Sequence, residues 1–583
     1  MQGASPRDYR PLNRPGRLGS RRAVVLIAGV AVIVLLMALG ARAVISRAIC
    51  GSQPVIVNVA ASLDIAPAVQ KIGNYFNNLN RNVSGHCAEV EVTEQSSQHV
   101  AGQVSGETHT AGQLPVDAWV PESSLWVDLV RSSPLGTAAV RQTGVSVAQS
   151  PLVVVVPQQV AHEFTRAIGQ TSWKGLVDGV AGGKVQSAAM TFQMPDPTED
   201  ASGLAAVVEA RRVFGSAADP RGKMTSLVHN VQGTAPFNNV TALTDFAGLA
   251  QSALKVKPVT FTSEQAAGNY NRSAPGNQLA VYYPTLSGAD FNLDYPFTIT
   301  TGDPLKVRAA QMFSQVLNSA MEKSDVRQLG FRSADGQQDP SAAQYGIRTS
   351  APPALPATTP GEAQEALQQW KQLNLGSRDL VVTDVSQGSQ TMVGDQTAMS
   401  LLQKAASLGL GLFPDNTQMG AWEYADRLNG SQPYKVMVPM GGLTEQLGLI
   451  NRRQQLQQLA ETIKPYYGSR AALYASILAG FKWMAANYVP DRVNALIVLG
   501  SGASNAHDDI SLSQLTAQLR NAYNPQRPVE IIAVSAGSTA DTAALNEITS
   551  ITKGASFVVN KPSDIDKVFL DSVGLRICKP NCG

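Results

Sequence analysis

The sequence predicts an α/β protein with two folded domains behind an N-terminal apolar segment. Short apolar runs that read as buried strands alternate with amphipathic helical patterns, as in Val55–Ala60 followed by Ile65–Leu79. A proline-rich stretch then separates two halves that both show this alternation. With 583 residues the chain is too long for a single core, so two or three domains are expected.

The first half, residues 50–349, repeats the strand-then-helix pattern that is typical of α/β domains with parallel sheets. The apolar run Leu152–Val156 is long enough to be a central parallel strand. Further strands are predicted at Val116–Val120 and Leu279–Tyr283, and helices at Ser124–Arg131, Leu204–Phe214 and Arg308–Ser319.

Residues 350–375 are predicted to be a semi-stiff, proline-rich linker, because their composition cannot form a packed core. A second α/β domain follows at residues 376–575, and the short tail 576–583 contains two cysteines. The strands expected in this domain are Leu380–Thr383, Lys435–Val438, Ala495–Leu499, Val529–Val534 and Ser556–Val559.

The N-terminus predicts a single-pass membrane protein. Residues 1–22 form a basic tail, and residues 23–44 contain an uncharged apolar run long enough to span a bilayer. The arginines before this run predict a cytoplasmic N-terminus and an extracytoplasmic remainder. A cleaved signal peptide is the alternative, but its apolar region is normally only about 7–15 residues long. A net charge of +2 gives no indication of a nucleic-acid partner.

All four cysteines lie beyond the apolar run, in the part of the chain expected outside the membrane. An even number of cysteines in an exported chain predicts disulfides, and four cysteines allow three pairings. The most economical pairing joins Cys50 to Cys87 and Cys578 to Cys582. A metal held by the last two is the alternative, although no histidine cluster accompanies them.

Several serines of the first domain follow predicted strands and precede predicted helices. These serines are Ser62, Ser123, Ser124 and Ser202. In open α/β sheets ligands bind beyond the carboxyl ends of the strands, so these hydroxyls are candidate ligand contacts. Serine is also a favoured helix N-cap, which is the structural alternative. Tyr283 is a candidate aromatic wall of the same cleft or a core residue.

Five stretches of the first domain, in this order, resemble the two-lobed extracytoplasmic solute-binding proteins. They are Asn58–Pro67, Asp117–Trp126, Ser150–Val154, Pro195–Pro197 with Ser202–Leu204, and Leu293–Pro296. The resemblance is to the type found in actinobacterial proteins that join such a domain to a von Willebrand factor A domain. It implies a cleft between two lobes that binds a small solute or a cell-wall component, without catalysis.

The second domain resembles von Willebrand A domains, which have a doubly wound, Rossmann-like sheet. Its first strand ends in Asp384-Val385-Ser386, which is similar to the Asp-x-Ser-x-Ser loop of the family's metal-dependent adhesion site. The second serine of that loop is replaced by Gly388, and Ser389 comes one residue late. Asp384, Ser386 and Ser389 are therefore the candidate Mg²⁺ ligands that remain.

The other two loops of this site have also lost their expected ligands. Ala471 stands where the resemblance implies a threonine, and Ser501 stands where it implies an aspartate. Losing a carboxylate weakens any Mg²⁺ site, because this ion gives up its water reluctantly. The sequence thus predicts a degenerate site and no cofactor.

Together these features predict a non-catalytic binding or scaffold protein of the cell envelope. The second domain is expected to contact a protein partner without a metal. Metal-dependent adhesion through Mg²⁺ is the main alternative. An envelope hydrolase is a third hypothesis, for which the sequence shows no catalytic motif.

Overall fold

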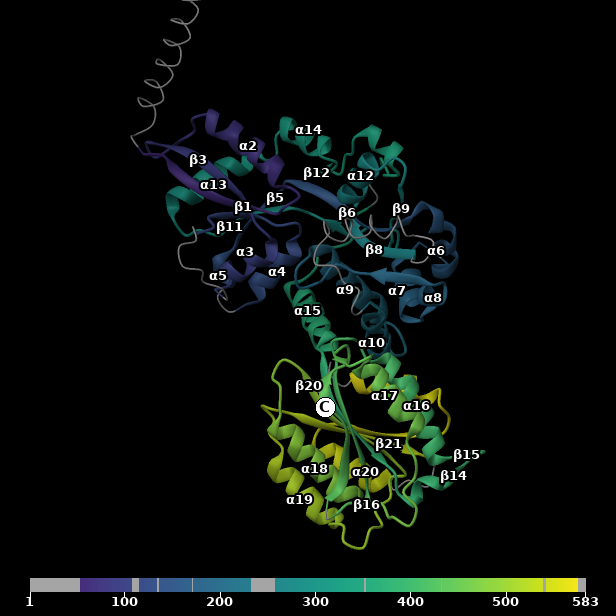
Figure 1. The fold of residues 1–583 in the computed structure, drawn as a ribbon. Coiled ribbons are helices and arrows are strands. Elements are labelled where there is room, and N and C mark those ends of the chain that lie inside the picture. The colour runs from purple at the N-terminus through teal and green to yellow at the C-terminus, as the bar shows by residue number, and fades with distance from the viewer. Residues whose placement is uncertain are drawn as a thin grey trace, which may run out of the picture.

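The computed structural model describes residues 53–106, 115–133, 136–169, 171–231, 257–350, 353–430, 432–537 and 542–574. Figure 1 shows a larger first domain and a smaller second domain that meet at a narrow junction. The predicted tail at 1–22 and anchor at 23–44 lie outside the described residues. In the part of the chain that is described, no helix combines the length and the apolar character needed to cross a bilayer.

The first domain consists of two lobes, each built on a six-stranded sheet. In lobe I the strand order is β2-β3-β1-β4-β11-β5. β1 is parallel to β3 and β4, and β11 is antiparallel to both β4 and β5. The strands are β1 (Val55–Ala61), β2 (Asn82–Val83), β3 (His86–Glu94), β4 (Ala118–Val120), β5 (Arg141–Ser146) and β11 (Pro296–Ile299); the helices are α2 (Ala66–Asn78), α3 (Ser97–Val104), α4 (Ser124–Ser132), α5 (Gly136–Ala139), α13 (Pro304–Val316) and α14 (Ala320–Gln328).

Lobe II is organised around the long strand β6, which pairs with four other strands and is antiparallel to all of them. The prediction of a central parallel strand at Leu152–Val156 was therefore wrong in direction. β6 carries the chain out of lobe I and β10 carries it back, so the two must run in opposite directions. The strands are β6 (Ala148–Pro157), β7 (Met190–Gln193), β8 (Lys257–Ser263), β9 (Leu279–Tyr282), β10 (Asn292–Leu293) and β12 (Arg332–Ser333); the helices are α6 (Ala161–Ile168), α7 (Trp173–Ala181), α8 (Lys184–Ser187), α9 (Ala201–Phe214), α10 (Pro220–Val231) and α12 (Glu264–Ser273).

The segment predicted as a linker, residues 350–375, contains a packed helix, α15 (Pro360–Asn374). Thr359 and Glu362 form a capping box at its N-terminus, which offsets the lack of intrahelical partners there. The helix packs against α4 of lobe I and α9 of lobe II. Ion pairs of 2.7 Å and 3.3 Å join it to lobe II, from Arg211 to Glu365 and from Arg212 to Glu362.

The second domain has a six-stranded sheet with the order β17-β16-β13-β20-β21-β22. All neighbours are parallel except the hairpin β16–β17, and the five strands predicted for this domain are confirmed. Helices α18, α19 and α20 cover one face, whereas α16, α17 and α21 lie on the other. The strands are β13 (Ser377–Asp384), β16 (Gln418–Asn429), β17 (Gln432–Gly442), β20 (Val493–Gly500), β21 (Val529–Ala536) and β22 (Ala555–Val559); the helices are α16 (Ala398–Leu412), α17 (Arg452–Thr462), α18 (Leu473–Ala486), α19 (Leu512–Ala522), α20 (Thr542–Ile551) and α21 (Asp564–Gly574).

The two domains also touch through α10 and α21. The ring of His229 lies edge-on to that of Phe569, with centroids 5.1 Å apart, and Phe413 packs edge-on to the same phenylalanine at 5.2 Å. Burial lowers the pKa of His229 below its usual range, so this contact is between neutral aromatic groups.

Candidate functional site

The turn after β1 holds the first group of the candidate site. Ser62 is fully buried, and its Oγ donates a 2.8 Å hydrogen bond to Asp64 Oδ1. The hydroxyl of Tyr295 donates to the other oxygen of Asp64. Tyr295 has a φ of +40°, a conformation that residues other than glycine rarely adopt and that is often found at ligand sites. Ser62 therefore orients Asp64, which the sequence analysis missed although it lies in the same turn.

Ser123 and Ser124 lie at the beginning of α4, beyond the carboxyl end of β4. Ser123 is the N-cap, and its side chain accepts a hydrogen bond from the N–H of Leu125. The N–H of Ser124 donates a 2.7 Å hydrogen bond to Asp294 Oδ1. The structural alternative, an N-cap, thus applies to Ser123. These contacts fix the turn that carries Glu122, the residue immediately before them.

Lobe II contributes the beginning of α9. Asp200 is the N-cap, and both the N–H and the hydroxyl of Ser202 donate to its Oδ1. Ser202 is fully buried and Asp200 is 5% exposed. The hydroxyl predicted as a ligand contact is therefore used to hold a carboxylate, as it is at Ser62.

Three carboxylates, Asp64 and Glu122 of lobe I and Asp200 of lobe II, are close enough to influence one another. Burial, followed by repulsion from Asp64 and a smaller repulsion from Asp200, raises the pKa of Glu122 to about 8. Burial also raises the pKa of Asp64 and raises that of Tyr295, which all three carboxylates influence. The cluster spans the two lobes, and its strongest charge interactions are repulsive.

Two polar atoms of this cluster lack an ordinary hydrogen-bond partner. Glu122 Oε2 is buried without one, although the residue as a whole is partly exposed. The hydroxyl of Ser97, a fully buried residue of α3, also has none, and it lies near enough to Glu122 to lower its pKa by more than Asp200 raises it. Burying a polar atom without a hydrogen-bond partner destabilises a protein. Glu122 Oε2 and the hydroxyl of Ser97 are therefore the groups to which a ligand would hydrogen-bond.

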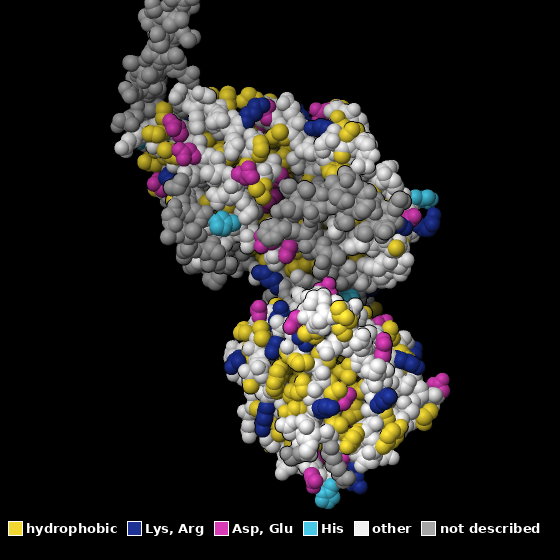
Figure 2. Space-filling model, viewed as in Figure 1, with side chains coloured by type: hydrophobic (Ala, Val, Ile, Leu, Met, Phe, Trp, Pro, Cys, Tyr) yellow, Lys and Arg dark blue, Asp and Glu magenta, His cyan; other side chains and the backbone are white. Residues whose placement is uncertain are grey.

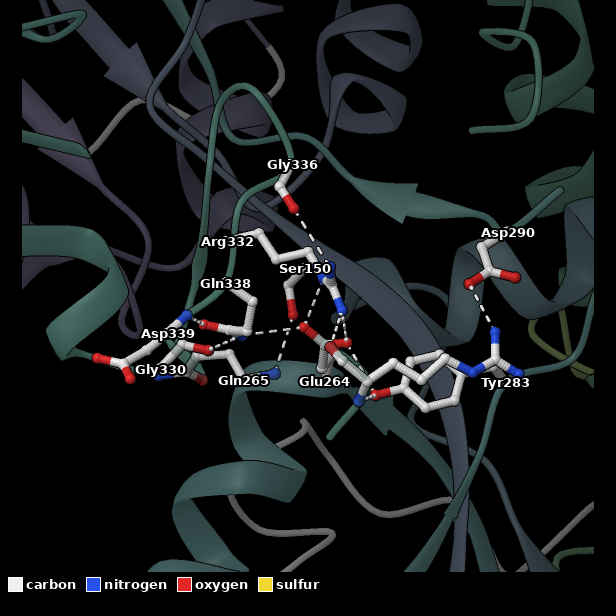
Figure 3. Close-up of polar contacts among 11 residues, drawn as sticks. Ser150, Glu264, Gln265, Tyr283, Asp290, Gly330, Arg332, Gly336, Gln338 and Asp339 are labelled. Atoms are coloured by element: carbon white, nitrogen blue, oxygen red, sulfur yellow. Dashed lines mark hydrogen bonds and ion pairs between the residues drawn. The ribbon is translucent and has the colours of Figure 1, made fainter. Parts of the chain in front are cut away.

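Tyr283 lies in a different environment from the four serines. Its hydroxyl donates a 2.8 Å hydrogen bond to Glu264 and accepts one of 3.1 Å from the N–H of Arg348. Glu264 also accepts two 2.8 Å hydrogen bonds from Arg332, and both residues of this ion pair are 1% exposed. Figure 3 shows this network within lobe II. Tyr283 is therefore part of a buried structural network.

The first domain is similar to a known protein family. Residues 57–332 match the family model of bacterial extracellular solute-binding proteins. No curated protein matches the chain. The first domain thus has a family match over a range that includes Ser62, Glu122, Asp200 and Tyr295.

Solved structures resemble the chain at low sequence identity. Iron-bound HitA from Pseudomonas aeruginosa is 17% identical with a TM-score of 0.39, over 55% of this chain and 100% of that chain. The sulfate-binding protein SubI from Mycobacterium tuberculosis H37Rv is 16% identical with a TM-score of 0.34, over 50% and 89%. A von Willebrand factor type A structure from Catenulispora acidiphila is 12% identical with a TM-score of 0.27, over 34% and 42%. Resemblances at this level support no functional assignment.

The second candidate site lies at the end of β13, in the second domain. Asp384 is 1% exposed and accepts hydrogen bonds from the N–H of Ser386 at 2.8 Å and from the hydroxyl of Ser501 at 3.3 Å. The hydroxyls of Ser386 and Ser389 are buried and have no hydrogen-bond partner. Burial raises the pKa of Asp384. The structure thus places the three candidate ligands in one loop and adds Ser501 to them.

The remaining loops supply little further negative charge to this site. Ala471 carries no ligand atom, and its N–H donates to Asn505. Asp509 is another carboxylate in these loops. It accepts hydrogen bonds from the N–H groups of Tyr474 and Ala475 at the beginning of α18. Throughout the described residues, no group of three or more His, Cys, Asp or Glu side chains has the arrangement of a metal site.

Cys87 is the only cysteine among the described residues, and it is disulfide-bonded. Cys50, Cys578 and Cys582 lie outside the described residues. The pairings predicted from the sequence stay predictions.

Proposed function

We propose that this chain is an extracytoplasmic binding protein whose first domain takes a small cationic solute between its lobes. The observation that carries the proposal is the cluster in which Asp64 of lobe I and Asp200 of lobe II both repel Glu122, while Glu122 Oε2 and the hydroxyl of Ser97 lack partners. The family match at residues 57–332 supports a binding role. A cation would relieve the repulsion and donate a hydrogen bond to the free carboxylate oxygen.

The cation that fits best carries an ammonium or guanidinium group. Such groups donate several hydrogen bonds to carboxylates and hydroxyls, which are the acceptors that this cluster presents. Asp64 and Asp200 each bind serines and backbone N–H groups, so they act mainly through their charge. A metal ion would need several of these carboxylates around one point, and the described residues contain no such group.

Titration calorimetry on the full chain tests this proposal with arginine and 1,4-diaminobutane as cations and sulfate and molybdate as anions. We expect saturable binding of at least one cation and none of either anion. Glu122→Gln should weaken cation binding by at least tenfold, because it removes the partly free carboxylate. Glu91→Gln, which changes an exposed carboxylate on β3, is the matched control. Binding of an anion that survives Glu122→Gln would refute the proposal.

The second domain is proposed to be a von Willebrand A domain that binds a protein partner without a metal. Near the Asp384 loop, the N–H of Tyr466 donates a hydrogen bond to the carbonyl oxygen of Val385, and this tyrosine is 47% exposed. The next residue, Tyr467, is 75% exposed. Exposed tyrosines are frequent anchors of protein interfaces. Figure 2 shows hydrophobic side chains gathered on the visible face of this domain.

Metal-dependent adhesion is the second candidate for this domain, and the free hydroxyls of Ser386 and Ser389 favour it. The missing second carboxylate is what opposes it. Calorimetry with Mg²⁺ or Mn²⁺ separates the two. Saturable heat that Ser386→Ala abolishes would establish a metal site, and no heat at millimolar metal would leave metal-free binding.

We also propose that residues 23–44 anchor the chain in the membrane with the bulk of it outside the cytoplasm. The support is the apolar run and the arginines before it, together with the extracellular description of the matching family. Alkaline extraction of membranes tests the anchor: the full chain should stay in the membrane pellet, and a chain lacking residues 1–44 should not. Protease added to intact cells should digest both folded domains.

A further inference from the structure

One face of the second domain's sheet is not fully covered. Val381 on β13 and Ile497 on β20 are only partly buried, although these two strands lie in the middle of the sheet. Central strands of a sheet with helices on both faces are normally buried on both sides. The side chains that face α16, α17 and α21 therefore border a space that these helices do not fill.

That space is a cavity of about 130 Å³ between the sheet and the three helices. Small residues create it, since α16 turns Ala405, Ala406 and Gly409 toward it. Its lining is apolar except for Thr383, Asp384, Gln403 and Ser572. Aliphatic side chains of α17 and α21, with Phe569, line the side of the cavity that faces the sheet.

The shape and chemistry of the cavity limit what it can hold. Side chains of four neighbouring strands, β16, β13, β20 and β21, line it, and at about 4.8 Å per spacing the outer two strands lie roughly 14 Å apart. An apolar cavity of about 150 Å³ stays dry and takes up an apolar molecule the size of benzene. A helix of about 10 Å diameter is too wide to enter. A long, narrow, apolar space therefore favours an unbranched chain.

We propose that this cavity binds a single hydrocarbon chain, such as the acyl chain of a lipid. The chain lies against Val381 and Ile497, and its methylene groups replace the contacts that the small residues of α16 do not make. The few polar side chains of the lining provide hydrogen bonds for a single hydroxyl or ester at its head. This site is separate from the carboxylate cluster of the first domain, and neither proposal depends on the other.

Photolabelling locates the chain directly. The full chain, purified in a steroid detergent too bulky for the cavity, is irradiated with a linear alcohol that carries a diazirine at its end, and labelled peptides are identified by mass spectrometry. We expect labelling of peptides from α16, α17 and α21, and competition by 1-decanol. Each methylene added to the competitor should strengthen its effect about fourfold, until the cavity is full.

Filling the cavity provides the controls. Ala406→Phe on α16 and Ala460→Phe on α17 place a ring in the lining from two different helices, and both should remove the competed labelling. Ala517→Phe makes the same change at an exposed position of α19 and should leave it unchanged. Thermal melting shows whether each variant is folded. Labelling that decanol does not displace, or that both folded filling variants retain, would overturn the proposal.

Discussion

Two groups of buried acidic residues in the first domain differ in how their charge is balanced. In lobe II, Glu264 accepts hydrogen bonds from Arg332, Tyr283 and Gln338, so its charge is neutralised inside the protein. In the second group, Glu122 is repelled by Asp64 and Asp200 and has an oxygen without a partner. A carboxylate paired internally stabilises one fold, whereas a carboxylate left unpaired is a place for an external cation.

Breaking the paired group should have the largest effect on stability. Arg332→Met leaves the carboxylate of Glu264 buried without a cation and should lower the free energy of unfolding by about 3–5 kcal/mol. Lys323→Met, in a 3.1 Å pair with Asp335 whose members are 28% and 48% exposed, is the matched control and should cost less than about 1 kcal/mol. Urea denaturation measures both. Equal losses in the free energy of unfolding of the two variants would show that burial does not strengthen the pair of Arg332 and Glu264.

The contribution of Glu122 to the stability of the fold should depend on pH. The folded protein holds the pKa of Glu122 at about 8, above its ordinary 4.5, so its contribution to stability is present below pH 4.5 and is lost as pH rises to about 8. Glu122→Gln should therefore leave the melting temperature unchanged near pH 4.5 and raise it by a few degrees at pH 8.5. A variant that is less stable than the wild type at pH 8.5 would show that Glu122 has an internal partner.

The same raised pKa should make binding of a cation pH-dependent. At neutral pH Glu122 is mostly protonated and must lose its proton to pair with a cation. Affinity for the cation should rise by up to tenfold per pH unit between pH 6 and 8 and then level off, with proton release visible in calorimetry in buffers of different ionisation heat. A flat profile would show that binding does not involve Glu122.

The smallest effect on stability is expected in the second domain, because its unpaired hydroxyls are uncharged. Ser386→Ala removes a buried hydroxyl without a partner and should change the free energy of unfolding by less than about 1 kcal/mol, toward greater stability. Ser550→Ala, on the exposed side of α20, is the control. A loss of more than about 2 kcal/mol would mean that Ser386 has a partner, such as an ordered water.

Much of the fold follows from local pattern. The predicted helix Leu204–Phe214 is confirmed as part of α9, and the apolar run Leu380–Thr383 lies within β13. The direction of β6 could not be predicted, because strand direction depends on how the chain crosses between the lobes. Helix α15 was not predicted, because the prolines before it are typical of a linker. Thr359 and Glu362 nevertheless have the spacing of a capping box.

The positions of the four serines in the fold could be predicted from the sequence, but the contacts of their hydroxyls could not. The four serines do lie at strand ends and helix beginnings, yet their hydroxyls or N–H groups serve mainly to hold Asp64, Asp200 and Asp294. A strand-end serine next to an aspartate in the same turn was the available signal. The burial and mutual repulsion that make these carboxylates important depend on the meeting of two lobes, which no single stretch of sequence contains.

Helix α15 couples the position of the second domain to the positions of the two lobes. It rests on α4 of one lobe and α9 of the other, and only two residues separate its end at Asn374 from the first strand of the second domain at Ser377. If the lobes swing apart, α15 must detach from one of them and follow the other, and β13 follows α15. The orientation of the second domain would then depend on whether the two lobes are together or apart.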